Sequence, residues 1–600
     1  MPRFNLPIVS LILAAASPNL LAASVSGLVS DPDGQAIANA QVTLRNEALG
    51  KSTTVYSNND GHYFVELAQA GSYTLRARRL GFNTVTETAI ELPQEQPFPR
   101  AITLKPIPKS QWVHELPASD WFARTGFSSP ELRGQFAIQC AMCHQQGGST
   151  TRLHHSEDEW HKLFNMMGEY GAVMNQALYD EAPGVLNKAY DFANLDLTSF
   201  PDQPTERYNG DVEITEWEVG HDTAFLHDMV VGADGKIYSV DWINDKLFSL
   251  DPLTNVVREW QVPTNGLAPG GILGILSERG RSYLHHTPTV APHSLQVGPE
   301  GKLWITLSVG RGLASFDPTT ETFRTFDHPD KAKYPHTLRF DNEGNVWYTV
   351  SMTNHLGKFN LEEETFTIYN LPTRNFTQWA VARGMGLLVW ASNVLGMKPQ
   401  AIVSDPEMNP VPYGIDVTPD GKVWFTQFNN RRIGNIDPAT EEITMIDTPF
   451  YGPRRMRADS NGLLWIPSYN SGMFYRFDPA DNSFKEFAVP TGRGDMVYAL
   501  AIDPRDDSVW LCGTNSDSII HFDPTTERFD VYQLPTRVSF TRELEVDEEG
   551  NVWTSTSNMP FYQVEGMRGK IVRLSFPKQQ LEHTAERQTQ PLAEATTHAQ

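Results

Sequence analysis

The residues with the most specific chemistry in this sequence are two cysteines and a histidine. Cys140 and Cys143 are separated by two residues, and His144 follows directly. A C-x-x-C-H run is the attachment signature of c-type haem, because the thiols can bond the porphyrin vinyl groups and the imidazole can ligate the iron. The alternatives for such a pair are a redox disulfide or half of a zinc site. The chain has only 3 Cys in 600 residues, which excludes a four-thiolate zinc site.

A haem iron in an electron carrier commonly takes a methionine on its other face, which raises its reduction potential. The segment 160–172 reads W-H-K-L-F-N-M-M-G-E-Y-G-A. With the C-x-x-C-H run, it resembles class I bacterial cytochromes c, in which W-x6-M lies on a helix and Gly-Ala follows. The resemblance implies that Trp160 is the family tryptophan and Met167 the axial ligand. The alternative ligands are Met166, Met174, His154 and His155.

The composition is acidic, with 72 Asp+Glu against 48 Lys+Arg and a net charge of −24. This balance disfavours nucleic acid as a partner. Its simplest interpretation is solubility, and the functional alternative is steering toward a basic, soluble redox protein. Beyond the N-terminus no apolar run reaches the length of a membrane span, so we expect no stable membrane insertion.

The chain divides into segments that differ in pattern. Residues 1–23 have a positive Arg3, an apolar stretch and small residues at the end, which is typical of a signal peptide. We therefore expect an exported protein, periplasmic or secreted, which agrees with haem attachment outside the bacterial cytoplasm. The predicted segments that follow are a β-sandwich (24–105), a linker (106–127), a haem domain (128–205), a propeller (206–577) and a disordered tail (578–600).

Short alternating strands and turns fill residues 24–105. The turns 31–34 (D-P-D-G) and 59–61 (N-D-G) combine residues that fix or permit the required backbone angles. The order V-x-G-x-V, A-x-V-x-L, D-G-x-Y-x-F and G-x-Y-x-L-x-A resembles the carboxypeptidase regulatory-like (transthyretin-like) domain. This resemblance implies a binding or spacer module and no catalysis.

From about residue 210 the chain repeats a unit of short strands. An aromatic residue follows a D-G-like turn in each unit, and four of the six intervals between these aromatics are 41–45 residues. The positions are Tyr238, Trp304, Trp347, Trp424, Trp465, Trp510 and Trp553. A repeat of this length with several strands predicts a seven-bladed β-propeller. The strand at 212–217 precedes the first unit and is expected to complete the last blade, which lacks an outer strand.

This repeat resembles the virginiamycin B (streptogramin) lyase propeller. That family opens a lactone by elimination, with a metal held by two Glu and a catalytic His. In this sequence Arg542 stands at the place of the catalytic His, Thr556 at that of a metal-binding Glu, and Tyr498 at that of the family's substrate-binding His. The lyase site is therefore not carried over. The propeller is expected to carry different chemistry.

The first residues of the seven inner strands are expected to point into the central channel at one mouth. They are His227, His293, His336, Tyr413, Arg455, Tyr498 and Arg542. Arginine and tyrosine suit an anionic or oxygen-rich ligand, and a His can act as a base. The three His lie on consecutive blades and could share a second metal in the channel, and Asp241 could orient His227 or ligate beside it. The alternative is that these residues satisfy channel water.

Two insertions interrupt the repeat. One spans 266–292 and contains His285 and His286. The other spans 373–411, and its stretch 384–397 carries no charge. An exposed apolar run usually marks a contact. We predict that 384–397 docks the haem domain or covers the channel, and a membrane-surface contact is the less favoured alternative.

Together these patterns predict a mainly β protein with an N-terminal β-sandwich, a small α-helical cytochrome c domain and a seven-bladed propeller. The expected function is that of an exported haem c oxidoreductase. It would pass electrons between a small-molecule substrate at the propeller mouth and a redox partner. The alternatives are a non-catalytic haem c carrier or sensor and, disfavoured, a lyase acting on a cyclic ester.

Overall fold

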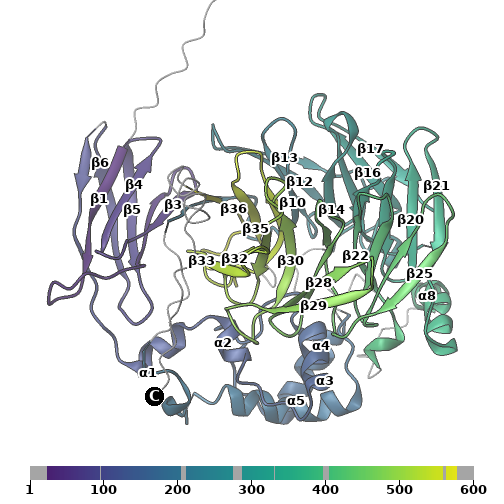
Figure 1. Cartoon of the computed structure of the whole chain (residues 1–600), viewed down its shortest axis with the longest axis horizontal. Coiled ribbons are helices and arrows are strands. Elements are labelled where there is room, and N and C mark those ends of the chain that lie inside the picture. Colours follow the sequence, from purple (N-terminus) through teal and green to yellow (C-terminus); the bar gives the residue numbers. More distant parts are fainter. Residues whose placement is uncertain are drawn as a thin grey trace, which may run out of the picture.

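The computed structural model describes residues 23–94, 96–169, 171–192, 194–203, 211–274, 287–329, 332–395, 405–558 and 563–576. The predicted signal peptide up to residue 22, the predicted tail, His285 and His286 lie outside these residues. A sandwich, a row of helices and a ring of four-stranded sheets make up the described chain (Figure 1). The protein is mainly β, as predicted.

The N-terminal sandwich consists of two sheets that enclose one apolar core. One sheet contains β1 (Ala23–Ser30), β4 (His62–Leu67), β7 (Pro97–Pro99) and β8 (Ile102–Thr103). The other contains β2 (Gln41–Asn46), β3 (Lys51–Tyr56), β5 (Gly71–Arg78) and β6 (Val85–Leu92). Alternate residues such as Val25, Val65 and Leu75 are fully buried between the sheets, which explains the alternating sequence pattern.

Short helices follow the sandwich and run along one face of the ring (Figure 1). They are α1 (Lys109–Trp112), η1 (Val113–Glu115), α2 (Ala118–Phe122), α3 (Pro130–Cys140), α4 (Glu157–Glu169), α5 (Gln176–Ala189) and η2 (Leu197–Ser199). Helix α3 begins where the Ser129 side chain accepts the Leu132 N–H, with Pro130 in the first turn. Helix α5 contacts both α3 and α4, so these three form one helical unit.

Six sheets of the ring contain four consecutive strands each. The first three are β10 (Leu226–Val231), β11 (Ile237–Asp241), β12 (Lys246–Asp251) and β13 (Val256–Gln261); β14 (Pro292–Val297), β15 (Leu303–Leu307), β16 (Gly312–Asp317) and β17 (Thr322–Asp327); β18 (Pro335–Phe340), β19 (Val346–Val350), β20 (His355–Asn360) and β21 (Thr365–Asn370). The next three are β22 (Pro412–Val417), β23 (Val423–Gln427), β24 (Arg432–Ile436) and β25 (Ile443–Asp447); β26 (Arg457–Ala458), β27 (Leu464–Ser468), β28 (Met473–Asp478) and β29 (Ser483–Ala488); β30 (Val497–Ile502), β31 (Val509–Gly513), β32 (Ser518–Asp523) and β33 (Arg528–Gln533).

The seventh sheet closes the ring. It contains β34 (Thr541–Val546), β35 (Val552–Thr556), β36 (Lys570–Ser575) and β9 (Glu213–Glu218), which comes from before the first blade. The prediction that this early strand completes the last blade is therefore confirmed, with Val572 paired to Glu216. The inner strand β10 contacts both β14 and β34, so the sheets form a closed propeller.

The repeated aromatics have a common structural role. In several blades the indole N–H donates to the aspartate that opens the preceding turn, at 2.7 Å for Trp347 to Asp341 and 3.0 Å for Trp465 to Asp459. The same aspartates accept backbone N–H groups of their own turns. Each bond ties the second strand of a blade to the turn before it, which explains why turn and Trp recur together.

One sheet runs without interruption from the propeller into the sandwich. Strand β9 pairs with β36 on one side and with β3 on the other, in an eight-stranded order β34-β35-β36-β9-β3-β2-β5-β6. The junction is reinforced by Arg45, which donates to Glu218 at 2.8 Å. The sandwich is thereby joined to the last blade by backbone hydrogen bonds rather than through a flexible tether.

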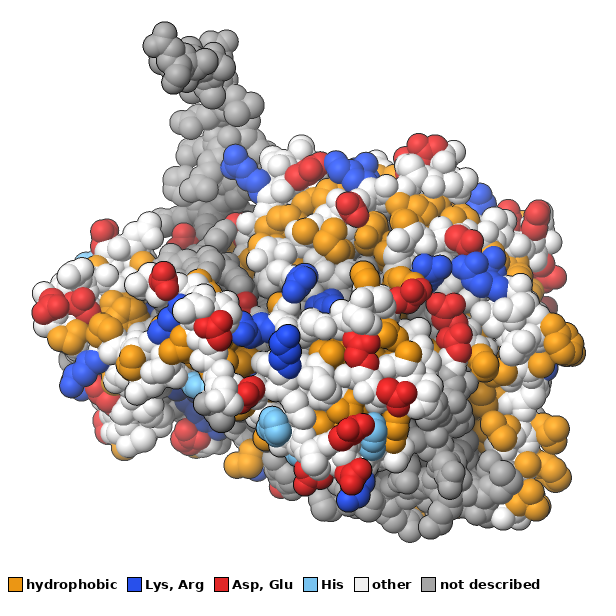
Figure 2. All heavy atoms as spheres, turned by 90° about the horizontal axis from the view of Figure 1, so that it is seen from below, with side chains coloured by type: hydrophobic (Ala, Val, Ile, Leu, Met, Phe, Trp, Pro, Cys, Tyr) orange, Lys and Arg blue, Asp and Glu red, His pale blue; other side chains and the backbone are white. Residues whose placement is uncertain are grey.

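The second insertion contains the long helix α8 (Phe376–Leu395) at the side of the propeller, and this helix includes the described part of the uncharged stretch 384–397 (Figure 1). Its Val389 is buried against propeller residues Leu273, Ala291 and Val309. Its other face exposes large apolar side chains, namely Phe376, Trp379, Leu387, Trp390 and Val394. Apolar side chains gather at this side of the molecule in Figure 2. Among the described residues, no helix is long and apolar enough to cross a membrane.

Candidate functional site

The inner strands of six blades share an irregularity that directs side chains into the channel. In β10, β14, β18, β22, β30 and β34 the pairing with the next strand shifts register after the first residue. Such bulges re-aim side chains. The second residue of each strand is a residue predicted to form the ring: His227, His293, His336, Tyr413, Tyr498 and Arg542.

The chain enters four of these strands through a residue with left-handed backbone geometry. Two positions before a ring residue, φ is +48° at Ala291, +69° at Tyr334, +53° at Val411 and +41° at Phe540. None of these is glycine, and a side chain in this conformation costs about 1–3 kcal/mol. The surrounding packing therefore imposes the same entry turn at successive blades.

The three channel histidines lie side by side in a row, with their rings tilted to one another. The ring centroids of His227 and His293 are 3.8 Å apart, and those of His293 and His336 are 4.1 Å apart. Burial, helped by nearby arginines, lowers the pKa of His227 and His336 well below the ordinary value, so these imidazoles are neutral at pH 7. In the part of the chain that the structure describes, no group of three or more His, Cys, Asp or Glu is arranged to hold a metal ion. A second metal in the channel stays a prediction.

The predicted partner of His227 was wrong. Asp241 caps its own turn, where it accepts the N–H groups of Phe225 and Ile243 at 3.1 and 3.2 Å. The carboxylate beside His227 belongs instead to the next residue, Asp228, at 2.8 Å from Nδ1. The bulge explains this, because it turns two consecutive residues toward the channel.

The fifth blade differs from the others, because its inner strand β26 has only two residues. Arg455 lies just before this strand, and Arg457 is its first residue. Arg455, the predicted ring residue, is fully buried and pairs with Asp228 at 2.6 Å and with Glu543. Arg457 also donates to Glu543, at 2.6 Å. These two acids therefore neutralise Arg455 and Arg457 inside the channel.

Arg454 is a functional candidate that the sequence pattern missed. Its guanidinium donates to the Tyr413 hydroxyl at 2.6 Å and lies 3.6 Å from the ring centroid of Tyr498. Arg542 donates to the Tyr498 hydroxyl at 2.8 Å. The ion pairs among the described residues include neither Arg454 nor Arg542. The only signal was the doubled arginine in P-R-R-M, where the repeat assigns a single ring residue.

Several N–H groups of these two arginines are unused. Nε and Nη1 of Arg454 and Nε of Arg542 are buried and have no hydrogen-bond partner among the described residues. A buried donor without a partner costs about 1–3 kcal/mol, and more when it is charged. Two cations with unused donors and no acidic partner are complementary to an anion.

The arginines change the acidity of the tyrosine between them. Tyr413 and Tyr498 share a hydrogen bond of 2.9 Å. Burial raises the pKa of Tyr413 well above its ordinary value. Burial also opposes ionisation of Tyr498, but Arg454, Arg542 and Arg455 together outweigh it and lower the pKa of Tyr498 to about 8. Tyr498 is therefore the channel group closest to acid–base function at neutral pH.

The C-x-x-C-H segment lies against this mouth. It begins at the last residue of α3, and its carbonyl groups face the propeller: Arg542 donates to the Cys143 carbonyl at 3.1 Å, and the Tyr469 hydroxyl donates to that of Ala141. One guanidinium thus joins the segment to the Tyr498 hydroxyl. The sequence predicted both parts of this site but not their contact.

The residues that follow the motif fix it to the propeller. Gln145 donates to Asp517 at 2.6 Å and to the Thr514 carbonyl at 2.8 Å. Gln146 and Asn515 exchange two bonds, with the Gln146 N–H donating at 3.1 Å and Asn515 Nδ2 donating back at 3.0 Å. The turn between β31 and β32 of the sixth blade thereby holds the motif in one position.

The two thiols are free and partly exposed, so the structure contains no disulfide between Cys140 and Cys143. Burial raises the pKa of Cys140 to about 12 and also raises that of Cys143, although Arg542 and Arg454 act in the opposite direction on Cys143. The thiols are therefore protonated at neutral pH.

The predicted axial residues lie on the helical unit. Met166 and Met167 are half-buried near the end of α4, and Met174 is buried in one cluster with Trp160 and Phe164. The Trp160 indole donates to Asn187 of α5 at 2.8 Å, and its ring stacks on Phe164. His154 is exposed, while His155 packs edge-on against Trp160.

Comparisons with known proteins find matches to the N-terminal sandwich segment and to the C-terminal part of the propeller. The carboxypeptidase regulatory-like domain matches residues 24–105. The described residues of that segment therefore form a domain of this kind. The virginiamycin B lyase family matches residues 400–580, so this part of the propeller is similar to that family. Neither match includes 128–205, and the cytochrome c domain stays a prediction.

Several solved structures are similar to part of this chain. Virginiamycin B lyase from Staphylococcus aureus is 15% identical, with a TM-score of 0.46 over 61% of this chain and 100% of that one. A streptogramin B lyase is 17% identical, with a TM-score of 0.46 over 61% of this chain and 98% of its own. U3-55K is 9% identical, with a TM-score of 0.43 over 62% of this chain and 100% of its own. No curated protein matches the chain.

Proposed function

We propose that this protein is an exported c-type cytochrome whose propeller binds a small anionic or oxygen-rich substrate. Electrons would pass between that substrate and a soluble redox protein. The observation that carries the proposal is the position of Arg542, which donates to the Cys143 carbonyl and to the Tyr498 hydroxyl. The haem-attachment motif and the polar ring are therefore parts of one site.

The residues at the mouth fit a haem c group. Cys140 and Cys143 are free to form thioether bonds, and His144 follows in the turn. When bound, haem c would supply one-electron chemistry. The sixth ligand remains Met167 in this proposal, with Met166, Met174, His154 and His155 as the alternatives.

The chain's own residues would bind the substrate and move its proton. Arg454 and Arg542 would orient a carboxylate or another oxygen-rich group. Tyr498, with a pKa of about 8, would accept a proton at its Oη atom better than the buried histidines, whose pKa values lie well below 6.5. This assignment replaces the expectation that a ring His acts as the base.

The helical unit would shield this chemistry from water. Helices α2–α5 lie across the mouth side of the propeller in Figure 1, and Tyr413, Tyr498 and Phe136 share one apolar cluster between the two parts. Excluding water strengthens the interaction of the arginines with a bound anion.

A spectroscopic titration tests this function. The exported protein, produced with the haem-attachment machinery, is mixed anaerobically with small carboxylates and phenols, and the haem band is followed. We expect at least one compound to reduce the haem, and Arg454→Gln and Arg542→Gln to slow the reduction. Arg573→Gln, in the same last blade but on the outer strands, is the matched control and should leave the rate unchanged.

Failure of every compound to reduce a haem that dithionite reduces would refute the oxidoreductase proposal. The protein would then be a haem c carrier or sensor with recognition modules, which its continuous sheet from propeller to sandwich also suits. A lyase is disfavoured, because Arg542, Thr556 and Tyr498 occupy the positions of that family's functional residues. Export to the periplasm or beyond is part of the proposal, since haem c is attached there.

A further inference from the structure

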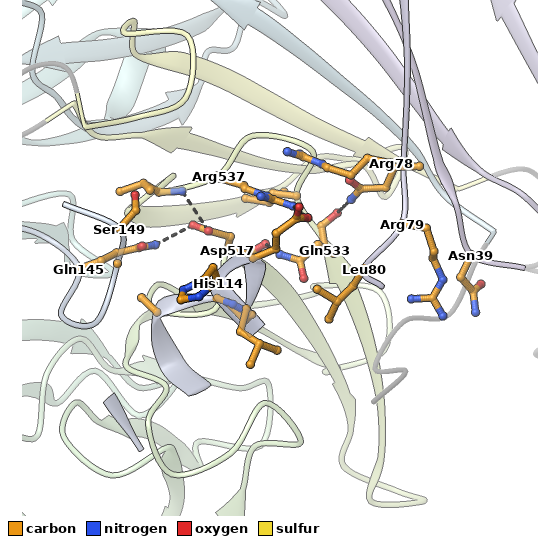
Figure 3. A pocket seen from close by; sticks show the side chains of 18 of the residues that line it. Asn39, Arg78, Arg79, Leu80, His114, Gln145, Ser149, Asp517, Gln533 and Arg537 are labelled. Atoms are coloured by element: carbon orange, nitrogen blue, oxygen red, sulfur yellow. Dashed lines mark hydrogen bonds and ion pairs between the residues drawn. The ribbon is translucent and has the colours of Figure 1, made fainter. Parts of the chain in front are cut away.

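A second polar site lies where the sandwich, the helical unit and the propeller meet. The cavity between them has a volume of about 140 Å³. Figure 3 shows its walls, with Arg78 and Arg79 from the sandwich, His114 and Gln145 from the helical part, and Arg537 from the propeller. None of these residues belongs to the channel ring.

The charges around this cavity do not balance. Four arginines line it, Arg78, Arg79, Arg152 and Arg537, against two acids, Glu115 and Asp517. Both acids already have partners: Glu115 accepts from Arg537 at 3.0 Å, and Asp517 accepts from Gln145 at 2.6 Å. The lining residues therefore include more positively than negatively charged side chains.

Arg152 differs from the other arginines of this wall in having buried N–H groups without a partner among the described residues. Only 5% of it is exposed, yet Nε and Nη1 have no hydrogen-bond partner among the described residues. Its Nη2 donates to the His114 carbonyl at 3.0 Å, and its guanidinium lies 4.4 Å from the ring centroid of Trp121. Burial lowers the pKa of Arg152 to about 10, which indicates that the cation lacks a counter-charge.

Arg78 is the second buried cation of this wall. Its partner Glu565 lies outside the cavity lining and is shared with Arg76, at 3.2 and 2.9 Å respectively. Burial lowers the pKa of Arg78 to about 10 in spite of that carboxylate. The cavity thus combines Arg152, which has unused donors, with Arg78, which shares its carboxylate with Arg76, and the two come from different parts of the chain.

We propose that this cavity is a binding site for a small, doubly charged oxyanion such as inorganic phosphate or a short dicarboxylate. Its volume holds about five water molecules at ~30 Å³ each, which matches such an ion. Guanidinium groups bind these oxygens through paired hydrogen bonds. A bound anion would join the sandwich, the propeller and the loop that follows Cys143 and His144, and would stabilise the motif against the mouth.

Titration calorimetry of the full exported chain in low-salt buffer, with inorganic phosphate and with succinate in turn, tests this proposal. We expect one saturable site for at least one of the two ions, a rise in Tm, and a change in tryptophan fluorescence because Arg152 contacts Trp121. The ion that binds identifies the source. If neither ion binds saturably at millimolar concentrations, the proposal is refuted.

Variants distinguish the site from general charge effects. Arg152→Gln should weaken binding at least tenfold. Arg133→Gln is the matched control. Like Arg152, Arg133 lies over an aromatic ring (Phe122) and has a buried N–H group without a partner among the described residues, but it does not line the cavity. Equal affinity in Arg152→Gln and the wild type would overturn the proposal. Since Arg152→Gln can fail to fold, Ser149→Glu provides a second test: Ser149 is exposed at the cavity, and the added negative charge should abolish binding without disturbing the core.

Discussion

Replacing Arg542 by glutamine tests the electrostatics of the channel mouth. Arg542 donates to the Tyr498 hydroxyl at 2.8 Å and is one of three arginines that lower the pKa of Tyr498 to about 8. A hydrogen bond to a charged group contributes about 1.5–3 kcal/mol. Since about 1.36 kcal/mol corresponds to a tenfold change in acidity, we expect the pKa of Tyr498 to rise to between about 9 and 10.

The assay is a pH titration of tyrosinate absorbance in the ultraviolet. Subtracting the curve of a Tyr498→Phe protein isolates Tyr498 from the other tyrosines. The matched control is Arg573→Gln, whose arginine stacks near Trp217 and Trp553 in the same blade and should leave the pKa of Tyr498 near 8. An unchanged pKa in Arg542→Gln would show that Arg542 does not stabilise the phenolate, and the proposed base would lose its support.

Three further predictions concern the pH response, the axial ligand and the sheet junction. The pKa of Tyr498 is about 8 in the folded chain and about 10 in the unfolded one, so the unfolded state binds more protons between these pH values. Ionised Tyr498 therefore stabilises the folded state by about 3 kcal/mol. This stabilisation is complete above pH ~10 and is lost as the pH falls through about 8. Urea unfolding of wild type and Tyr498→Phe should therefore diverge as the pH rises from 8, and parallel curves would contradict this. Met167→Ala should remove the weak oxidised-state band near ~695 nm that marks methionine ligation, whereas Met174→Ala should keep it; the reverse result would make Met174 the ligand. Thr53→Pro, in the interior of β3 between β2 and β9, should lower the free energy of unfolding by about 1–3 kcal/mol through a lost ladder bond, while Thr53→Ser should not; equal urea midpoints would show that the junction carries no stability.

The architecture could be predicted from the sequence where one local rule repeats. The turn-and-Trp unit recurs because in several blades the Trp binds the aspartate of its own turn, as Trp347 does with Asp341. The count of blades and the return of β9 to the last blade followed from that repeat. Six of the seven ring residues also occupy equivalent positions, because the inner strands of their blades share the same bulge.

Predictions from the repeat were wrong or incomplete where a blade departs from the common pattern. The inner strand of the fifth blade has only two residues. The repeat therefore predicted Arg455 as the only channel residue of this blade and missed Arg454. Asp228 and Glu543 were missed because the bulge turns a second residue inward, which an alternating pattern does not reveal. Asp241 was misassigned from spacing alone, although it caps its own turn.

Contacts between distant segments could not be predicted from local patterns. The pairing of β3 with β9 depends on two strand edges that meet in space, and neither edge has a distinctive sequence. The same holds for the contact of the C-x-x-C-H segment with Arg542. The stretch 384–397 was predicted as an apolar contact, and its described residues belong to a helix with one buried and one exposed face.

Mass spectrometry of the exported chain after treatment with an alkylating reagent tests the central proposal most directly. We predict a polypeptide that carries the added mass of one haem, with Cys140 and Cys143 resistant to alkylation because both sulfurs are in thioether bonds. A chain without haem mass, in which both thiols are alkylated, would contradict the account and leave the propeller without an electron path.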